Sequence, residues 1–139
     1  MIEMVTTLVV AGILVSIAAP KLDGVITQSR IRALLDQMAS DIAYARMLAV
    51  REGQPTSVRI SATEYVVTVD NPAKIDTIKR VRVGDDYGKT TRLGGATRLS
   101  FSSRGTLRSA TGGTTVRASR EAIKDSLSVT QLGGVNRGK

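Results

Sequence analysis

The chain has 139 residues, no cysteine and no histidine, and a formal net charge of +8. Without these two residue types it has no disulfide framework, thiol nucleophile, imidazole base or ordinary zinc ligand. Its length fits one domain, and we expect no enzyme activity, no catalytic residue, no metal site and no cofactor.

The chain begins with an apolar segment that ends at a proline. From Met4 to Ala19 sixteen consecutive residues carry no charge, and Glu3 stands just before them. A membrane-spanning helix needs roughly 17 to 25 apolar residues, so the length is marginal. We expect residues 1–20 to form a hydrophobic helix half, in a membrane or a filament core. An ionised Glu3 would need a partner or an aqueous edge there.

A second helical pattern follows in residues 21–52. Apolar residues recur every three or four positions, which predicts an amphipathic helix with one core-facing stripe: Val25, Ile26, Ile31, Leu34, Leu35, Met38, Ile42, Ala45 and Ala49. Gly53 and Pro55 are a stop signal. Pro20 could kink the helix without ending it, and a continuous helix from Ile2 to Glu52 would be about 75 Å long.

Residues 55–132 change to short alternating segments. An alternation with the period of strands recurs along this region: Val58 and Ile60, Tyr65 to Val69, Val81 and Val83, Leu99 and Phe101, Val116 and Ala118, and Leu127 and Val129. Turn residues separate them, at Asp70–Pro72, Gly94–Gly95, Arg104–Gly105 and Gly112–Gly113. We predict an α+β fold: a long N-terminal helix packed on an antiparallel sheet or sandwich, within a head that spans residues 21–139.

The segment from Gly84 to Thr90 is the nearest approach to a phosphate-binding loop. Three residues separate its glycines, whereas the motif requires four. Asp85 and Asp86 would repel phosphate, and a calcium site gathers more oxygen ligands than these two. We predict a loop between strands.

Basic residues dominate after Pro20. All twenty lysines and arginines lie there, against eleven acidic residues. From Lys89 onward the sequence contains ten basic residues and only two acidic residues, Glu121 and Asp125. Such a surface attracts polyanions, while solubility alone is the simpler explanation.

The N-terminal segment IEMVTTLVVAGILVSIAAP resembles that of type IV pilins and type II secretion pseudopilins. The resemblance implies assembly roles for Glu3, Gly12 and Pro20. Glu3 would neutralise the N-terminal amine of a neighbouring subunit, and the helix between Gly12 and Pro20 could unwind in a filament. The family's methylated aromatic residue, four positions before the glutamate, and the preceding glycine cleavage site have no counterpart, because only Met1 and Ile2 precede Glu3.

Two later segments, ALLDQMASDIAYARMLAVREGQPTSVRIS and LSFSSRGTLRS, resemble minor pilins and minor pseudopilins such as the H pseudopilin of type II secretion and the fimbrial T minor pilin. The resemblance implies a structural subunit. It would sit as a single-pass protein in the bacterial inner membrane, and then join other subunits in a periplasmic or extracellular filament.

Three further functions are compatible with the same residues. The C-terminus, SVTQLGGVNRGK, lies where DNA-uptake members carry a glycine-arginine motif, although its first arginine is missing here. A DNA-binding minor pilin would use Arg104, Arg108, Arg117, Arg137 and Lys139 on one exposed face. Arg137 and Lys139, in a mobile C-terminal tail, would contact the phosphates. A subunit of a secretion pseudopilus is the second function, and a membrane anchor with an unrelated β domain is the third.

Overall fold

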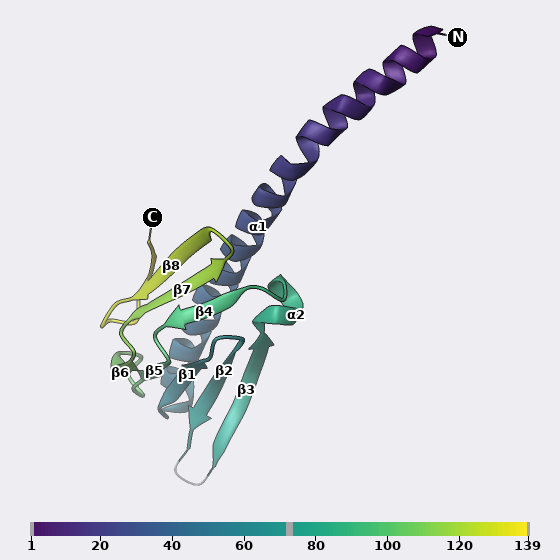
Figure 1. The fold of residues 1–139 in the computed structure, drawn as a ribbon. Helices are drawn as coiled ribbons and strands as arrows, with labels where there is room; N and C mark the ends of the chain where they lie inside the picture. Colours follow the sequence, from purple (N-terminus) through teal and green to yellow (C-terminus); the bar gives the residue numbers. More distant parts are fainter. Residues whose placement is uncertain (1, 72–73, 139) are drawn as a thin grey trace.

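The computed structural model describes residues 2–71 and 74–138, and it is organised around one long helix, α1 (Ile2–Glu52) (Figure 1). The N-terminal half of α1 projects away from the rest of the chain, and its C-terminal half lies behind the strands of the head. At 1.5 Å per residue the helix is about 75 Å long. The predicted α+β fold and the continuous helix to Glu52 are confirmed. Gly53, with φ of 65°, follows the helix in the left-handed conformation typical of a helix end.

The strands form two antiparallel sheets. Sheet A has five strands in the order β3 (Ile75–Arg82), β2 (Glu64–Asp70), β1 (Thr56–Ile60), β5 (Arg98–Phe101) and β6 (Leu107–Thr111). Sheet B has four strands in the order β4 (Arg92–Gly95), β7 (Thr115–Arg120), β8 (Ile123–Val129) and β9 (Val135–Arg137). A short helix, α2 (Val83–Tyr87), connects β3 to β4.

The core lies between α1 and the two sheets. Side chains of α1 are buried against residues of both sheets, including Val58, Leu99, Phe101, Val116 and Leu127. The buried residues on α1 are Ile31, Leu34, Leu35, Met38, Ile42, Ala45 and Ala49. The predicted stripe is therefore confirmed from Ile31 onward. Val25 and Ile26, predicted to belong to the stripe, are 65% and 47% exposed. The first buried residue after them is Thr27, so the head covers α1 only from about that point.

Several local predictions were wrong. Val83, expected in a strand, begins α2, so the segment predicted as a loop contains a helical turn. Gly94 and Gly95, expected in a turn, lie in β4 and pair with Arg117 and Val116 of β7. The chain also forms β9 after residue 132, where a mobile tail was expected for a DNA-binding chain.

Candidate functional site

The projecting part of α1 is an apolar surface. Its large apolar side chains are between 55% and 82% exposed: Ile2, Met4, Val5, Leu8, Val9, Val10, Ile13 and Leu14. The hydroxyls of Thr6 and Thr7 donate hydrogen bonds to the carbonyl of Glu3, at 2.9 and 2.8 Å, so they are satisfied within the helix. A contiguous apolar surface of this kind marks a contact with a protein or a membrane.

Glu3 lies in the first turn of α1, where the helix dipole favours a negative charge. Its side chain is exposed, and none of the residues in 2–71 and 74–138 forms an ion pair with it. Gly12 is exposed, and a Cβ added there would meet no atom within 4 Å. The helix continues through Pro20. The three predicted assembly residues thus lie along one helix, about 25 Å from first to last.

Over the described residues, none of the helices has the length and apolarity required to traverse a membrane.

The head is held to α1 by a buried carboxylate. Asp41 is 4% exposed and accepts hydrogen bonds from the Tyr65 hydroxyl of β2 at 2.6 Å, from Lys79 Nζ of β3 at 2.7 Å and from Gln37 Nε2 at 3.1 Å. Burial, followed by the hydrogen bond to Asp41, raises the pKa of Tyr65, so its hydroxyl remains a donor. Three donors from three elements therefore satisfy one charge inside the head.

A second polar cluster fixes the C-terminal strand. Arg137 of β9 donates to Asp125 Oδ2 of β8 from Nη2 at 2.5 Å and from Nε at 3.1 Å. Its Nη1 lies 3.2 Å from Asp36 Oδ1 on α1. Burial raises the pKa of Asp125, but the hydrogen bonds from Arg137 and from the Ser126 amide outweigh it, so the pKa lies below its ordinary value. Arg137 therefore lies in a folded strand and not in the mobile tail that was expected, and its contact with phosphates stays a prediction.

The other predicted DNA-binding residues are spread over the head. Arg117 alternates with buried Val116 and Ala118 and points away from α1, whereas Arg137 contacts α1, so the two lie on opposite faces of sheet B. Arg104 is in the turn after β5, and Arg108 is exposed on β6. Lys139 lies outside the described residues. The structure does not bring the four described residues onto one face.

Sequence reasoning missed a more coherent basic surface on sheet B. Arg92, Ser119 and Lys124 are paired across β4, β7 and β8, and Gly94, Arg117 and Ser126 form the next row. The residues of the adjacent rows, Leu93, Val116, Ala118 and Leu127, are buried, so these positions face outward, and none of the six is acidic. The alternation of charged and apolar residues was visible in the sequence, but the pairing of β4 with β7 was not.

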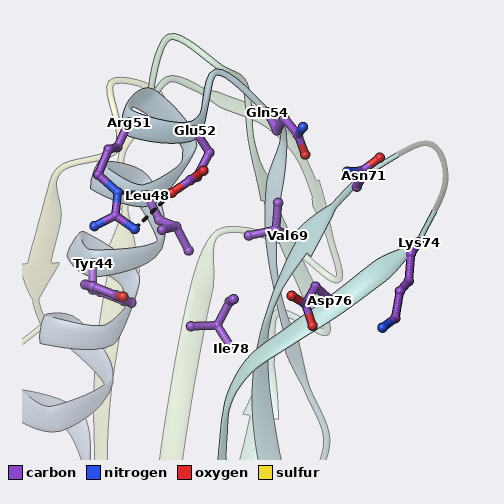
Figure 2. A pocket seen from close by; sticks show the side chains of 10 residues that line it. All are labelled: Tyr44, Leu48, Arg51, Glu52, Gln54, Val69, Asn71, Lys74, Asp76 and Ile78. Carbon is purple, nitrogen blue, oxygen red and sulfur yellow. Dashed lines mark hydrogen bonds and ion pairs between the residues drawn. The ribbon is translucent and has the colours of Figure 1, made fainter.

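A hollow lies between the end of α1 and the hairpin of β2 and β3 (Figure 2). It has a volume of about 390 Å³. Leu48, Val69 and Ile78 supply apolar surface. The ion pair between Arg51 and Glu52, at 2.9 Å, contributes one charge of each sign. Lys74 and Asp76 add a further charge of each sign. This mixed lining favours no single class of ligand.

Asp85 and Asp86 are exposed on α2. Within the described ranges, no group of three or more acidic side chains is arranged to hold a metal ion.

Comparisons with known proteins place these surfaces in context. A family model described as type II transport protein GspH matches residues 34–133. The chain is similar in structure to the type IV minor pilin FimU of Pseudomonas aeruginosa, with 16% sequence identity, a TM-score of 0.61 and coverage of 80% of this chain and 90% of that one. It is also similar to the minor pseudopilin EpsH from the type II secretion system of Vibrio cholerae, with 11% identity, a TM-score of 0.62 and coverage of 79% and 94%. A search of curated proteins finds no match. At these identities the structural likeness shows a shared fold.

Proposed function

Because the chain belongs to the family of the type II transport protein GspH, we propose that it is a subunit of a type IV pilus or a type II secretion pseudopilus, assembled through its N-terminal helix. The observation that carries this proposal is the projecting half of α1, whose large apolar side chains are exposed from Ile2 to Leu14. The fold shared with a minor pilin and a minor pseudopilin supports a minor subunit.

Assembly follows from the chemistry of this helix. Each square ångström of apolar surface removed from water contributes about 25 cal/mol, so packing against neighbouring helices is favourable. A carboxylate among such helices needs a cation, because an unpaired charge is costly in an apolar environment. The N-terminal amine of a neighbouring subunit would supply the cation for Glu3. Gly12 and Pro20 bound the segment that would unwind, since neither residue favours a helix interior.

The location before assembly is part of the same proposal. Residues 1–20 would hold the chain in the bacterial inner membrane until it is extracted into the filament. Residues 21–139, with the amphipathic part of α1 and the strands, would form the periplasmic or extracellular head.

The test compares the effects of removing two carboxylates on α1, Glu3 and Asp23. Glu3→Gln in the full chain, expressed in its host with its sibling subunits, should greatly reduce recovery of the protein in sheared filaments. Asp23→Asn is the matched control, because it removes an exposed carboxylate about 30 Å along the same helix. Filaments that contain the Glu3→Gln chain at the wild-type level would contradict this role for Glu3.

Binding of duplex DNA by the head is a second candidate, favoured by the outward face of sheet B. Arg92, Arg117 and Lys124 there lie beside serine hydroxyls, a combination that contacts phosphates. Replacing Arg117 and Lys124 by glutamine should reduce the slope of log K against log salt by about 1.8, since each phosphate contact contributes about 0.9. The same double exchange at Arg30 and Arg51, both exposed on α1, is the control. Absence of binding at low salt would exclude this candidate.

A further inference from the structure

The outward face of sheet A carries a row of arginines that the proposed function does not use. Residues paired across the five strands are, in order, Arg80 on β3, Val66 on β2, Arg59 on β1, Arg98 on β5 and Thr111 on β6. Their neighbours along the strands, such as Val58, Tyr65, Val81 and Leu99, are buried, so the arginines face away from α1. With strands about 4.8 Å apart, the backbone positions of the three arginines lie in one line across the sheet, although the Arg98 guanidinium is turned toward Asp70 and toward Ser57 in the neighbouring row.

A row of hydroxyl groups runs beside the arginines. The next outward-facing set of paired residues carries a hydroxyl on every strand of sheet A: Thr77, Thr68, Ser57, Ser100 and Ser109. On β1 and β5 each arginine has a hydroxyl two residues away on the same face, Ser57 beside Arg59 and Ser100 beside Arg98. Ser57 and Thr68 are buried at 0% and 3% exposure, so the face presents a row of arginines and, beside it, accessible hydroxyls at Thr77, Ser100 and Ser109.

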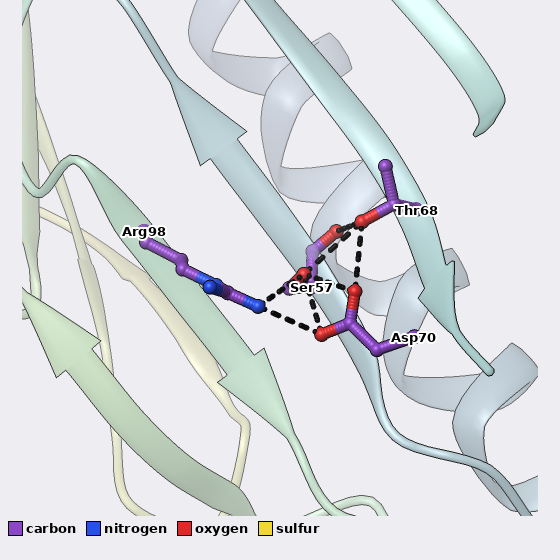
Figure 3. Close-up of polar contacts among 4 residues, drawn as sticks. All are labelled: Ser57, Thr68, Asp70 and Arg98. Atoms are coloured by element: carbon purple, nitrogen blue, oxygen red, sulfur yellow. Dashed lines mark hydrogen bonds and ion pairs between the residues drawn. The ribbon is translucent and has the colours of Figure 1, made fainter. Parts of the chain in front are cut away.

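This face already binds one carboxylate, its own Asp70 (Figure 3). Arg98 Nη2 donates to Asp70 Oδ2 at 2.8 Å. The Ser57 hydroxyl lies 3.0 and 2.9 Å from the two carboxylate oxygens, and Thr68 Oγ1 lies 3.3 Å from Oδ1. A guanidinium and neighbouring hydroxyls, the same groups that recur along the two rows, are thus sufficient to hold a carboxylate.

The remaining cations have no such partner. Arg59 is directly opposite Arg98, and like charges in opposed positions of a sheet repel each other. Among the described residues, Arg59 and Arg80 form no ion pair, and the Nε of Arg98 is buried without a hydrogen-bond partner. The other carboxylate on this face, Glu64, is opposite Arg82. Anions placed along the arginine row would remove this repulsion.

We propose that the outward face of sheet A binds an acidic polysaccharide, with carboxylates along the arginine row and sugar hydroxyls along the hydroxyl row. Arginine suits carboxylates because its fork of N–H donors matches their geometry. A polymer with an acid and free hydroxyls in each unit fits two parallel rows, whereas bases of a single strand would lack aromatic side chains to stack on. This binding is independent of entry into a filament.

The experiment measures affinity for polygalacturonate with the full chain in uncharged detergent micelles. Replacing Arg59 and Arg80 by glutamine should weaken binding at least about tenfold, as expected for the loss of one or more charge-assisted hydrogen bonds. Arg30→Gln with Arg51→Gln removes the same charge from exposed positions on α1 and should leave the affinity within about twofold, since it touches neither row. The fully methyl-esterified polymer, which keeps its hydroxyls and loses its charge, should not bind. Equal losses in the two double variants would overturn the proposal.

A second comparison isolates the hydroxyl row. Poly-L-glutamate carries carboxylates without sugar hydroxyls, so it should bind more weakly per charge than polygalacturonate. Ser100→Ala with Ser109→Ala, two positions outside the Asp70 cluster, should weaken polygalacturonate binding and leave poly-L-glutamate binding unchanged. If poly-L-glutamate binds as tightly as polygalacturonate, the polysaccharide assignment is wrong. Tighter binding of duplex DNA at Arg59 and Arg80 would also overturn it and assign the face to nucleic acid.

Discussion

At the scale of single residues, the buried carboxylate of Asp41 decides how α1 is attached to the head. Tyr65→Phe removes the donor that lies 2.6 Å from Asp41 Oδ2 and leaves a buried charge with one hydrogen bond fewer. We expect the free energy of unfolding to fall by about 1 to 3 kcal/mol. Urea titration measures the change. Tyr44→Phe, at a partly exposed tyrosine on α1, is the control and should change stability by less than about 0.5 kcal/mol. Equal effects of the two variants would contradict the role of Asp41.

Asp125 makes the attachment of β9 depend on pH. Its pKa is lower in the folded chain than the ordinary value of about 3.9, so its contribution to stability is present above about pH 4. As the pH falls through the lowered pKa, protonation removes the ion pair with Arg137 and the contribution is lost. The stability difference between wild type and Asp125→Asn should therefore be constant at neutral pH and shrink in acid. Hydrogen exchange of the β8 and β9 amides should show the same trend, and a difference that grows in acid would refute this account.

At the scale of elements, substitutions at two glycines distinguish the cost of backbone strain from the cost of steric overlap. Gly95, in β4, and Gly113, between β6 and β7, have φ of 90° and 95°, so alanine is strained at both. A Cβ at Gly95 would overlap the carbonyl oxygen of Thr115, whereas a Cβ at Gly113 meets nothing within 4 Å. Gly113→Ala should cost about 1 to 2 kcal/mol, and Gly95→Ala should cost more, because β4 must separate from β7. Equal unfolding midpoints in urea would show that β4 adjusts freely.

The elements also show what the sequence could predict. The periodicity of α1 and the alternation in β1, β2, β5, β7 and β8 are local signals, and these elements were predicted correctly. The strand β9 has only three residues, and it is stabilised in part by a contact distant in sequence, because Arg137 donates a hydrogen bond to Asp36, 101 residues away. Gly94 and Gly95 have turn propensity, but pairing with β7 overrides it. The registers that align Arg80, Arg59 and Arg98 likewise depend on tertiary pairing, so the arginine row could not be recognised as one feature beforehand.

At the scale of the whole molecule, the chain has one part that is packed around a core and one part whose apolar surface is exposed. From Thr27 onward α1 is packed in the head, whereas the apolar side chains from Ile2 to Leu14 are exposed. A chain that starts at residue 25 would therefore lose the exposed side chains of residues 2–14, which contribute nothing to the core of the head. It would also lose the apolar surface that favours association.

This division predicts opposite results for two truncations. The chain 25–139 should unfold with a free energy within about 1 kcal/mol of the full chain in detergent, and it should sediment as a monomer without detergent. The chain 39–139 also loses Ile31, Leu34 and Leu35, all almost fully buried. Since burial of each such side chain contributes about 1.5 to 3 kcal/mol, that loss approaches the whole stability of a small domain and the shorter chain should not fold. Circular dichroism and sedimentation velocity distinguish the two. If 25–139 fails to fold, or associates as the full chain does, the projecting helix is not separable from the head and its exposed surface is not what drives assembly.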